Sequence, residues 1–187
     1  MYNKLVLPRN WDIVASALEF IPNAVLAGSI VDHIHLSNDV SKDARVLKDI
    51  DFEIDQQDYV ALLAKCGIPY EGTPVKEIVF GDLNVHLVKF ELHSSITIYQ
   101  GSYKNKPIDF FVLPTKRASE VVKVGEFDIT CHTVDSRQDV IASILAIEMP
   151  KGKSRIMDMI WLKDKKEKLS KRSIVLAKMT SAKEMKW

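Results

Sequence analysis

The sequence has few of the features that mark secreted, disulfide-bonded or membrane-spanning proteins. It contains only two cysteines, Cys66 and Cys131, which are far apart and lack the spacing of a metal-ligand motif. Such cysteines are typical of free thiols in a reducing compartment, so we expect a cytoplasmic protein. The N-terminus has no long apolar core of the kind found in a signal peptide. The longest apolar run, residues 140–147, is far shorter than a membrane span, so we expect no membrane partner.

Charge is distributed unevenly along the chain. The net charge is +1, but residues 151–187 contain 12 Lys/Arg against 4 Asp/Glu, whereas residues 1–150 contain 14 against 21. A basic tail on an acidic body favours contact with a polyanion, such as nucleic acid or nucleotide phosphates. A solvated helix surface would give the same pattern, so both interpretations stay open. Because 47% of the residues are hydrophobic and 27% charged, the chain can bury a core.

The hydrophobic periodicity predicts an α+β fold. Apolar residues at helical spacing predict helices between Asn10 and Pro22, over residues 30–36 and from Asp55 to Cys66. Strands are predicted at residues 24–27, 48–54, 76–80, 85–92, 95–100, 107–113 and 126–133. After residue 136 the spacing is helical again, with one helix to residue 147, a second beginning at Ser154 and a last one over residues 171–186. We expect a mixed-sheet core over residues 1–133 and a helical C-terminal part, residues 134–187, packed on it.

The stretch Lys48–Ile54 alternates acidic and apolar residues. Successive side chains on a strand point to opposite faces, so Asp49, Asp51 and Glu53 would share one face. Carboxylates in a row repel one another unless cations lie between them. Any half-exposed strand shows such alternation, so the pattern by itself does not define a site. We expect Asp49 and Asp51 to be the functional pair, and Glu53 to be a surface or supporting acid.

Two other pieces of the chain could complete a site around this strand. Asp109 is an acid between apolar residues in the predicted strand 107–113, where an unpaired buried charge would be costly. Gly28 and Ser29 form a small-residue turn between a short strand and a helix. A glycine lets the backbone approach a ligand closely, and a helix N-terminus offers N–H groups and a positive dipole to phosphate. Carboxylates that hold two Mg²⁺ ions are common catalysts of phosphoryl transfer.

A Gly-Ser turn opening a helix, then acid-x-acid on a strand, then a single acid on a later strand, resembles the pattern of the nucleotidyltransferase superfamily. That superfamily shares its fold with DNA polymerase beta. The chain is most similar to the minimal nucleotidyltransferases and to the abortive-infection and toxin–antitoxin types. The resemblance implies that Gly28 and Ser29 hold the triphosphate and that Asp49, Asp51 and Asp109 hold two Mg²⁺ ions. It also implies that Asp109 activates the attacking hydroxyl.

The helical part of the chain departs from the family pattern at two positions. The family has an Arg-x-Lys-Asp helix start, and this chain keeps its Arg and Asp as Arg155 and Asp158 but has Met157 in place of Lys. The preceding helix often carries a Lys where this chain has Ile144. Arg155 and Asp158 could contact substrate or simply form an ion pair one helical turn apart.

We therefore predict a Mg²⁺-dependent nucleotidyltransferase that transfers NMP from an NTP to a hydroxyl on a nucleic acid such as tRNA, a protein or a small molecule. Lys151 or Lys153 could replace the missing lysines, and the expected nucleotide contacts are Gly28, Ser29, Lys153 and Arg155. The alternative is a catalytically degenerate nucleotidyltransferase-fold protein that acts as a binding or antitoxin-like partner. A two-metal nuclease is less favoured, because it would leave the Gly-Ser turn without a role.

Overall fold

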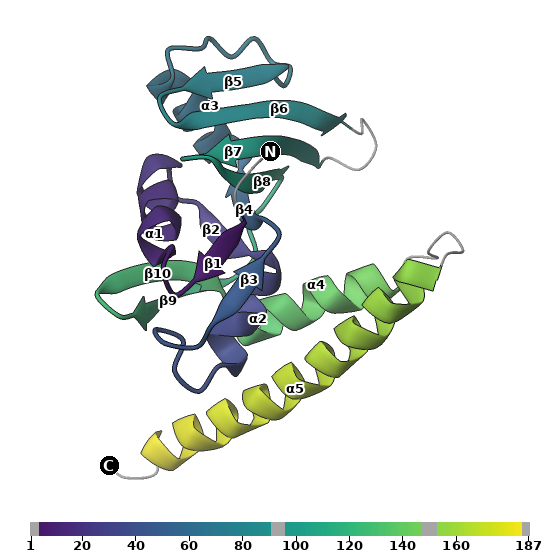
Figure 1. Cartoon of the computed structure of the whole chain (residues 1–187). Coiled ribbons are helices and arrows are strands. Elements are labelled where there is room, and N and C mark those ends of the chain that lie inside the picture. The colour runs from purple at the N-terminus through teal and green to yellow at the C-terminus, as the bar shows by residue number, and fades with distance from the viewer. Residues whose placement is uncertain (1–3, 91–95, 147–152, 185–187) are drawn as a thin grey trace.

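A computed structural model describes residues 4–90, 96–146 and 153–184, without the side chains of residues 89, 90, 146, 153–159 and 180–184. Over these ranges the protein is α+β, with five helices and ten strands (Figure 1). The predicted class, a mixed sheet with flanking helices, is confirmed at this level.

The central sheet has eight strands in the described part of the chain and is mixed. From one edge to the other it contains β5 (Glu77–Phe80), β6 (Leu83–Phe90), β7 (Thr97–Tyr103), β8 (Lys106–Leu113), β4 (Ile50–Asp55), β2 (Val25–Ala27), β10 (Phe127–His132) and β9 (Ser119–Val124). The pairs β4–β8 and β2–β10 are parallel, and the others are antiparallel. A separate small sheet pairs β1 (Leu5–Leu7) with β3 (Arg45–Leu47).

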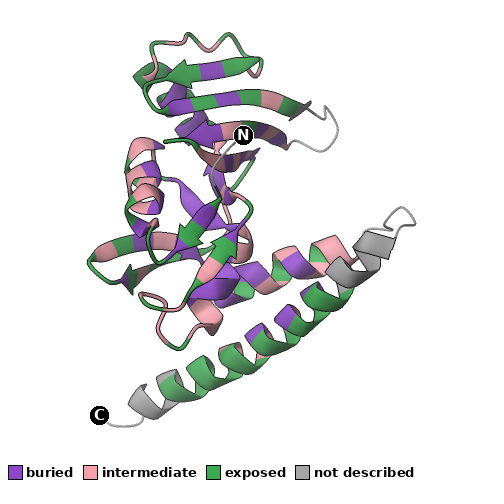
Figure 2. Ribbon diagram, in the orientation of Figure 1, coloured by how far each residue is buried: buried purple, intermediate pink, exposed green. Residues whose placement is uncertain are grey.

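The helices cover both faces of the central sheet. They are α1 (Trp11–Phe20), α2 (Gly28–Leu36), α3 (Gln56–Lys65), α4 (Val134–Ala146) and α5 (Lys153–Glu184). The apolar side chains of β4, Ile50, Phe52 and Ile54, are fully buried in one core with Val14 of α1 and Leu62 of α3. The long α5 packs along α4 and α2, and most of its described surface is exposed (Figure 2). No helix in the described ranges combines the length and the apolarity that a membrane span requires.

The start and end of α3 follow directly from the sequence. The Asp55 side chain accepts hydrogen bonds from the backbone N–H groups of Gln57 and Asp58, both at 3.0 Å. In turn, the backbone N–H of Asp55 donates a hydrogen bond to the Asp58 carboxylate. This reciprocal arrangement satisfies N–H groups that the first helical turn leaves unpaired. Gly67 has a φ of +70°, the left-handed conformation that ends many helices. The predicted cap at Asp55 is therefore confirmed, and β4 passes directly into α3.

The structure differs from the predicted elements in two respects. The strands β1, β3 and β9 were not predicted, because two of them have only three residues and the third is a largely exposed edge. The two helices predicted after Ser154 form one helix, α5, because residues 153–184 contain no Gly or Pro and two i,i+4 ion pairs, Asp164–Lys168 and Glu167–Lys171, span its middle. The break predicted around Met149–Lys153 falls mainly outside the described residues.

A buried ion pair joins α2 to α4. The guanidinium of Arg137 donates from Nε to Asp32 Oδ1 at 2.7 Å and from Nη2 to Asp32 Oδ2 at 3.1 Å. Asp32 is fully buried and Arg137 is 4% exposed. The two parallel hydrogen bonds fix the orientation as well as the distance between the two helices. Because α2 begins at the Gly-Ser turn, this pair also sets the position of that turn relative to α4.

We expect Asp32→Asn to lower the free energy of unfolding by about 3–5 kcal/mol, because it leaves the Arg137 charge buried without its anion. Asp164→Asn is the matched control: its partner Lys168 is exposed, and such pairs contribute about 1 kcal/mol or less. Urea denaturation of both variants measures the difference. Equal losses would show that the buried pair does not hold the helices together.

Candidate functional site

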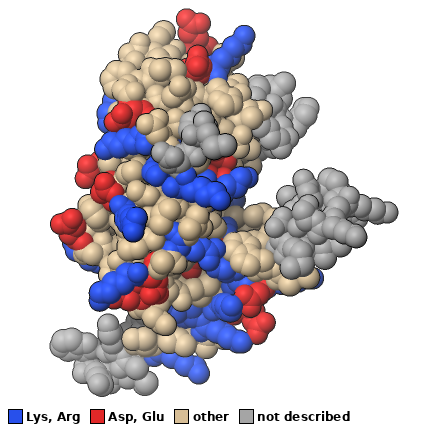
Figure 3. Space-filling view, viewed as in Figure 1, with Lys and Arg blue, Asp and Glu red and all other residues tan. Residues whose placement is uncertain are grey.

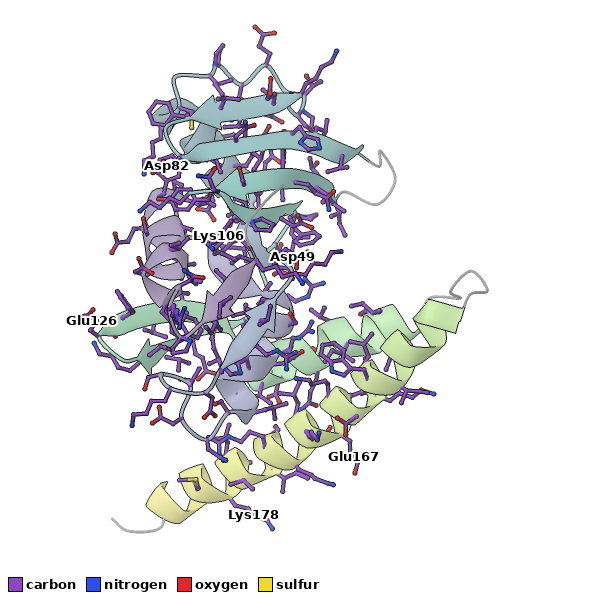
Figure 4. The ribbon with its side chains drawn as sticks, viewed as in Figure 1. Asp49, Asp82, Lys106, Glu126, Glu167 and Lys178 are labelled. Carbon is purple, nitrogen blue, oxygen red and sulfur yellow. The ribbon has the colours of Figure 1, made fainter. Side chains whose placement is uncertain are left out.

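The structure places two of the three predicted acids side by side on neighbouring strands, near the start of β4 and in the middle of β8. Asp51 and Asp109 are register partners on these neighbouring parallel strands. Asp49 directly precedes β4 instead of lying within it, and Figure 4 shows it on the side of the sheet that faces α4. All three carboxylates are half-buried. Two acids from segments nearly 60 residues apart in the chain therefore lie next to each other across a strand pair.

Gly28 approaches the Asp51 carboxylate so closely that a Cβ atom at this position would force the Asp51 side chain or the backbone to shift. A Cβ atom built on Gly28 would lie 1.7 Å from Asp51 Oδ2, and the glycine has a φ of +68° in the left-handed region. The helix α2 begins at Gly28, and no side chain caps its first turn in the described structure. The N–H groups of that turn, including that of Ser29, begin next to Asp51 and offer hydrogen-bond donors to an anion.

The environment of the acids raises the pKa of each of them. Burial, followed by the charges of Asp49 and Asp109, raises the pKa of Asp51 to about 7. Burial also raises the pKa of Asp49, against the opposing charge of Lys48. Burial raises the pKa of Asp109, although Gln100 donates a hydrogen bond to it at 2.8 Å and opposes the shift. The site thus concentrates negative charge that the described side chains do not neutralise.

The donor set fits a Mg²⁺ ion held partly by other ligands. Within the described residues no three His, Cys, Asp or Glu side chains are assembled into a group that could hold a metal by themselves. Mg²⁺ is commonly held by one or two carboxylates and completed by waters and substrate phosphates. Asp51 and Asp109 are in register, and repulsion from other acids of the site contributes to the raised pKa of each, so they are such a pair. Bound cations would relieve this repulsion.

A cavity of about 490 Å³ adjoins the acids, between the sheet and α4. Its volume is within the range of small-molecule sites. Polar groups on its wall come from Asp51, Glu53, Arg117, His132 and Arg137. The remaining wall is mainly apolar and includes Ile96, Ile98, Phe111, Leu113, Val140 and Ile144. The wall of the cavity therefore combines a few charged side chains with a mainly apolar lining from β7, β8 and α4.

Glu53 has a larger part in this cavity than the sequence indicated. Instead of lying at the surface it is 4% exposed, pairs with Arg117 and lies 2.8 Å from Nε2 of His132 through its Oε2 atom. Burial alone would raise the pKa of Glu53, but His132 and Arg117 outweigh it and hold this pKa below its ordinary value. Nδ1 of His132 is buried and makes no hydrogen bond among the described residues. The pattern around the acidic strand contained no signal for Arg117 or His132, which come from distant segments.

The predicted contacts in the helical part are only partly visible. Ile144 lines the cavity beside Asp51, so an apolar side chain occupies this part of the wall. The backbones of Lys153 and Arg155 belong to the first turn of α5, but their side chains lie outside the described part of the structure, as do those of Met157 and Asp158. The assignment of Lys153 and Arg155 as nucleotide contacts remains a prediction.

We expect Gly28→Ala to destabilise the protein more than Gly67→Ala does. Both glycines have a φ near +70°, so both substitutions introduce a strain of about 1–2 kcal/mol. Only at position 28 does the new Cβ atom meet Asp51, which should add about 1–3 kcal/mol of overpacking. Chemical denaturation of the two variants isolates the second effect. Similar losses at the two positions would contradict the close packing of Gly28 on Asp51.

We expect Asp51→Asn to stabilise the metal-free protein at pH 8 and to change its stability little at pH 4. The pKa of Asp51 rises from about 4 in the unfolded chain to about 7 in the folded one, so wild-type stability falls as the pH rises between these values. Asn removes this loss. Because Asp51 is half-buried, a gain of about 1–2 kcal/mol is expected, less than the full shift would give. Urea denaturation in EDTA across this pH range tests it, and a pH-independent difference would contradict the assigned shift.

Comparison with protein-family models, with curated proteins and with solved structures finds no match to this chain. What the protein does must therefore be inferred from its own residues and their geometry.

Proposed function

We propose that the protein is a Mg²⁺-dependent nucleotidyltransferase that transfers NMP from an NTP to a hydroxyl acceptor. The observation that carries the proposal is the register pairing of Asp51 with Asp109, with the Gly28 turn packed directly on the Asp51 carboxylate. The N–H groups that would donate hydrogen bonds to phosphate therefore lie next to the acids that would bind metal ions. Transfer of a nucleotide needs both kinds of group at one place, because the phosphates and the cations that neutralise them bind together.

Each part of the site has a defined role in the proposed reaction. The N–H groups at Gly28 and Ser29 bind and orient the phosphates. Asp49, Asp51 and Asp109 hold the Mg²⁺ ions, whose chemistry is to neutralise charge on the transferring phosphoryl group. The acceptor oxygen forms a bond with the α-phosphorus while the bond to pyrophosphate breaks, and the acceptor proton passes to Asp109. Burial raises the pKa of Asp109, which makes its carboxylate a stronger base than an exposed one.

The second candidate function is a binding protein that has kept this arrangement without catalysis. It is favoured by the wall of the cavity, where Ile144 supplies an apolar side chain and the two arginines are already paired, Arg117 with Glu53 and Arg137 with Asp32. A triphosphate would then find no free cation among the described residues that line the cavity. In this case the protein binds a partner, as an antitoxin-like protein would, and transfers nothing.

We expect at least one of the four NTPs to stabilise the purified protein thermally in a Mg²⁺-dependent way, since a ligand that binds the native state stabilises it by mass action. Four labelled NTPs, incubated with total RNA and cell lysate, reveal the acceptor as a labelled band. Asp51→Ala should abolish labelling. Asp82→Asn, an exposed acid remote from Asp49 in Figure 4, is the matched control and should leave labelling unchanged.

Two outcomes separate the candidates. Stabilisation by an NTP with loss of labelling in the Asp51 variant supports the transferase. No stabilisation by any NTP, with or without Mg²⁺, contradicts it and favours the binding protein.

A further inference from the structure

A second cavity lies at the opposite end of α2 from the Gly-Ser turn. It has a volume of about 430 Å³ and is lined by Asp32, His33, Leu36, Ser37, Asp43, Ala44, Arg45 and Lys165. These residues come from the second half of α2, the loop after it, the start of β3 and the middle of α5. Since α2 has nine residues, its two ends are about 13 Å apart. The Asp32–Arg137 pair separates the two cavities, with Arg137 on the wall of the first and Asp32 on the wall of the second.

Two cations in this cavity have no anionic partner among the described residues. Lys165 is only 8% exposed, and neither it nor the half-buried Arg45 forms an ion pair with any described residue. The Lys165 ammonium lies 5.0 Å from the centre of the Trp161 ring. Burial is the main cause that lowers the pKa of Lys165. The charge of Asp32 opposes this shift, and the charge of Arg45 reinforces it. A buried ammonium without a partner is unfavourable unless a ligand supplies the missing charge.

The acids on the same wall are already satisfied. Arg137 donates a hydrogen bond to each carboxylate oxygen of Asp32. The carboxylate of Asp43 accepts hydrogen bonds from the Ser37 hydroxyl and from the Asp39 N–H. The charge of Asp32 acts on Lys165, but the two side chains form no ion pair, so neutralising Asp32 is not the main role of Lys165.

His33 adds a buried polar atom that lacks a partner. Its side chain is 8% exposed, and its Nε2 atom is buried without a hydrogen bond to any described residue. Burial lowers the pKa of His33, and the charges of Arg45 and Lys165 lower it further, while a hydrogen bond and the charge of Asp43 oppose them. A bound anion would reverse the effect of the two cations and supply the missing partner.

We propose that this cavity is a binding site for a phosphate group, held by Lys165 and Arg45 with Nε2 of His33 as a third contact. Arginine and lysine are the usual partners of phosphate oxygens. The planar guanidinium of arginine can donate two parallel hydrogen bonds, and the ammonium of lysine supplies a localised charge. On the face of the molecule in Figure 3, Lys and Arg side chains lie along α5 and over the neighbouring body, which would favour the approach of an anion. The site stands apart from the acids, and the proposal does not rest on the transfer reaction.

The test is a titration of the whole protein, in EDTA and at constant ionic strength, with inorganic phosphate, pyrophosphate and phenyl phosphate. Amide NMR signals locate the bound ion, because the cavity (His33, Ser37 and Ala44) and the Gly28–Ser29 turn give separate signals. We expect saturable changes at the cavity and a rise in the pKa of the His33 ring at saturating ligand. If phenyl phosphate binds more tightly than the inorganic ions, the ligand is an organic phosphate. If the inorganic ions bind equally or more tightly, the ligand is free phosphate or pyrophosphate. No saturable change at the cavity with any of the three overturns the proposal.

Variants on one helix provide the matched comparison. Lys165→Met removes the buried charge and should weaken phosphate binding by about tenfold or more, as expected for the loss of a charged hydrogen bond. Lys163→Met removes the same charge from an exposed position on α5 and should leave the affinity unchanged. Arg45→Gln is a second variant, in case Lys165→Met fails to fold, and should also weaken binding. Unchanged affinity in the folded Lys165 and Arg45 variants, or an equal loss in the Lys163 variant, overturns the proposal.

Discussion

The buried ion pair between Asp32 and Arg137 sets the arrangement on which both cavities depend. A carboxylate and a guanidinium that are almost completely removed from water must stay paired, because either charge alone would be strongly unfavourable there. The pair therefore holds α2 and α4 in one relative position. This position places the Gly28 turn beside Asp51, closes the first cavity with α4, and leaves the far end of α2 facing α5.

Much of the fold was readable from the sequence because local chemistry determined it. Asp55 and Gly67 define the ends of α3 through a cap and a left-handed residue, and alternation along residues 50–54 defines β4. The strands that were missed, such as β1 and β3, have three residues each and exist because they pair with each other across about 40 positions. Such pairing depends on tertiary contacts that no short window contains. The continuity of α5 was missed because its polar, lysine-rich sequence has little helical periodicity.

The candidate site was readable only where its residues are close in sequence or follow a known order. Asp49, Asp51 and Asp109 were predicted as a group, and the structure does bring Asp51 and Asp109 into register. Glu53 was given a minor role, because the alternating pattern treats all acids on one face alike. Its actual environment depends on His132, at the end of β10, and on Arg117, in the loop between β8 and β9.

The two cavities differ in how their positive charge is distributed, and this difference has a chemical consequence. In the first, each described arginine on the wall is committed to a buried acid, Arg117 to Glu53 and Arg137 to Asp32. Among the described residues that line this cavity, an anion would be balanced by the N–H groups of α2 and by cations bound to the acids, so we expect binding of a triphosphate to depend on divalent metal. In the second, Lys165 and Arg45 are not paired with any described acid. Binding of phosphate there needs no metal, so chelation of divalent ions separates the two sites in a single protein.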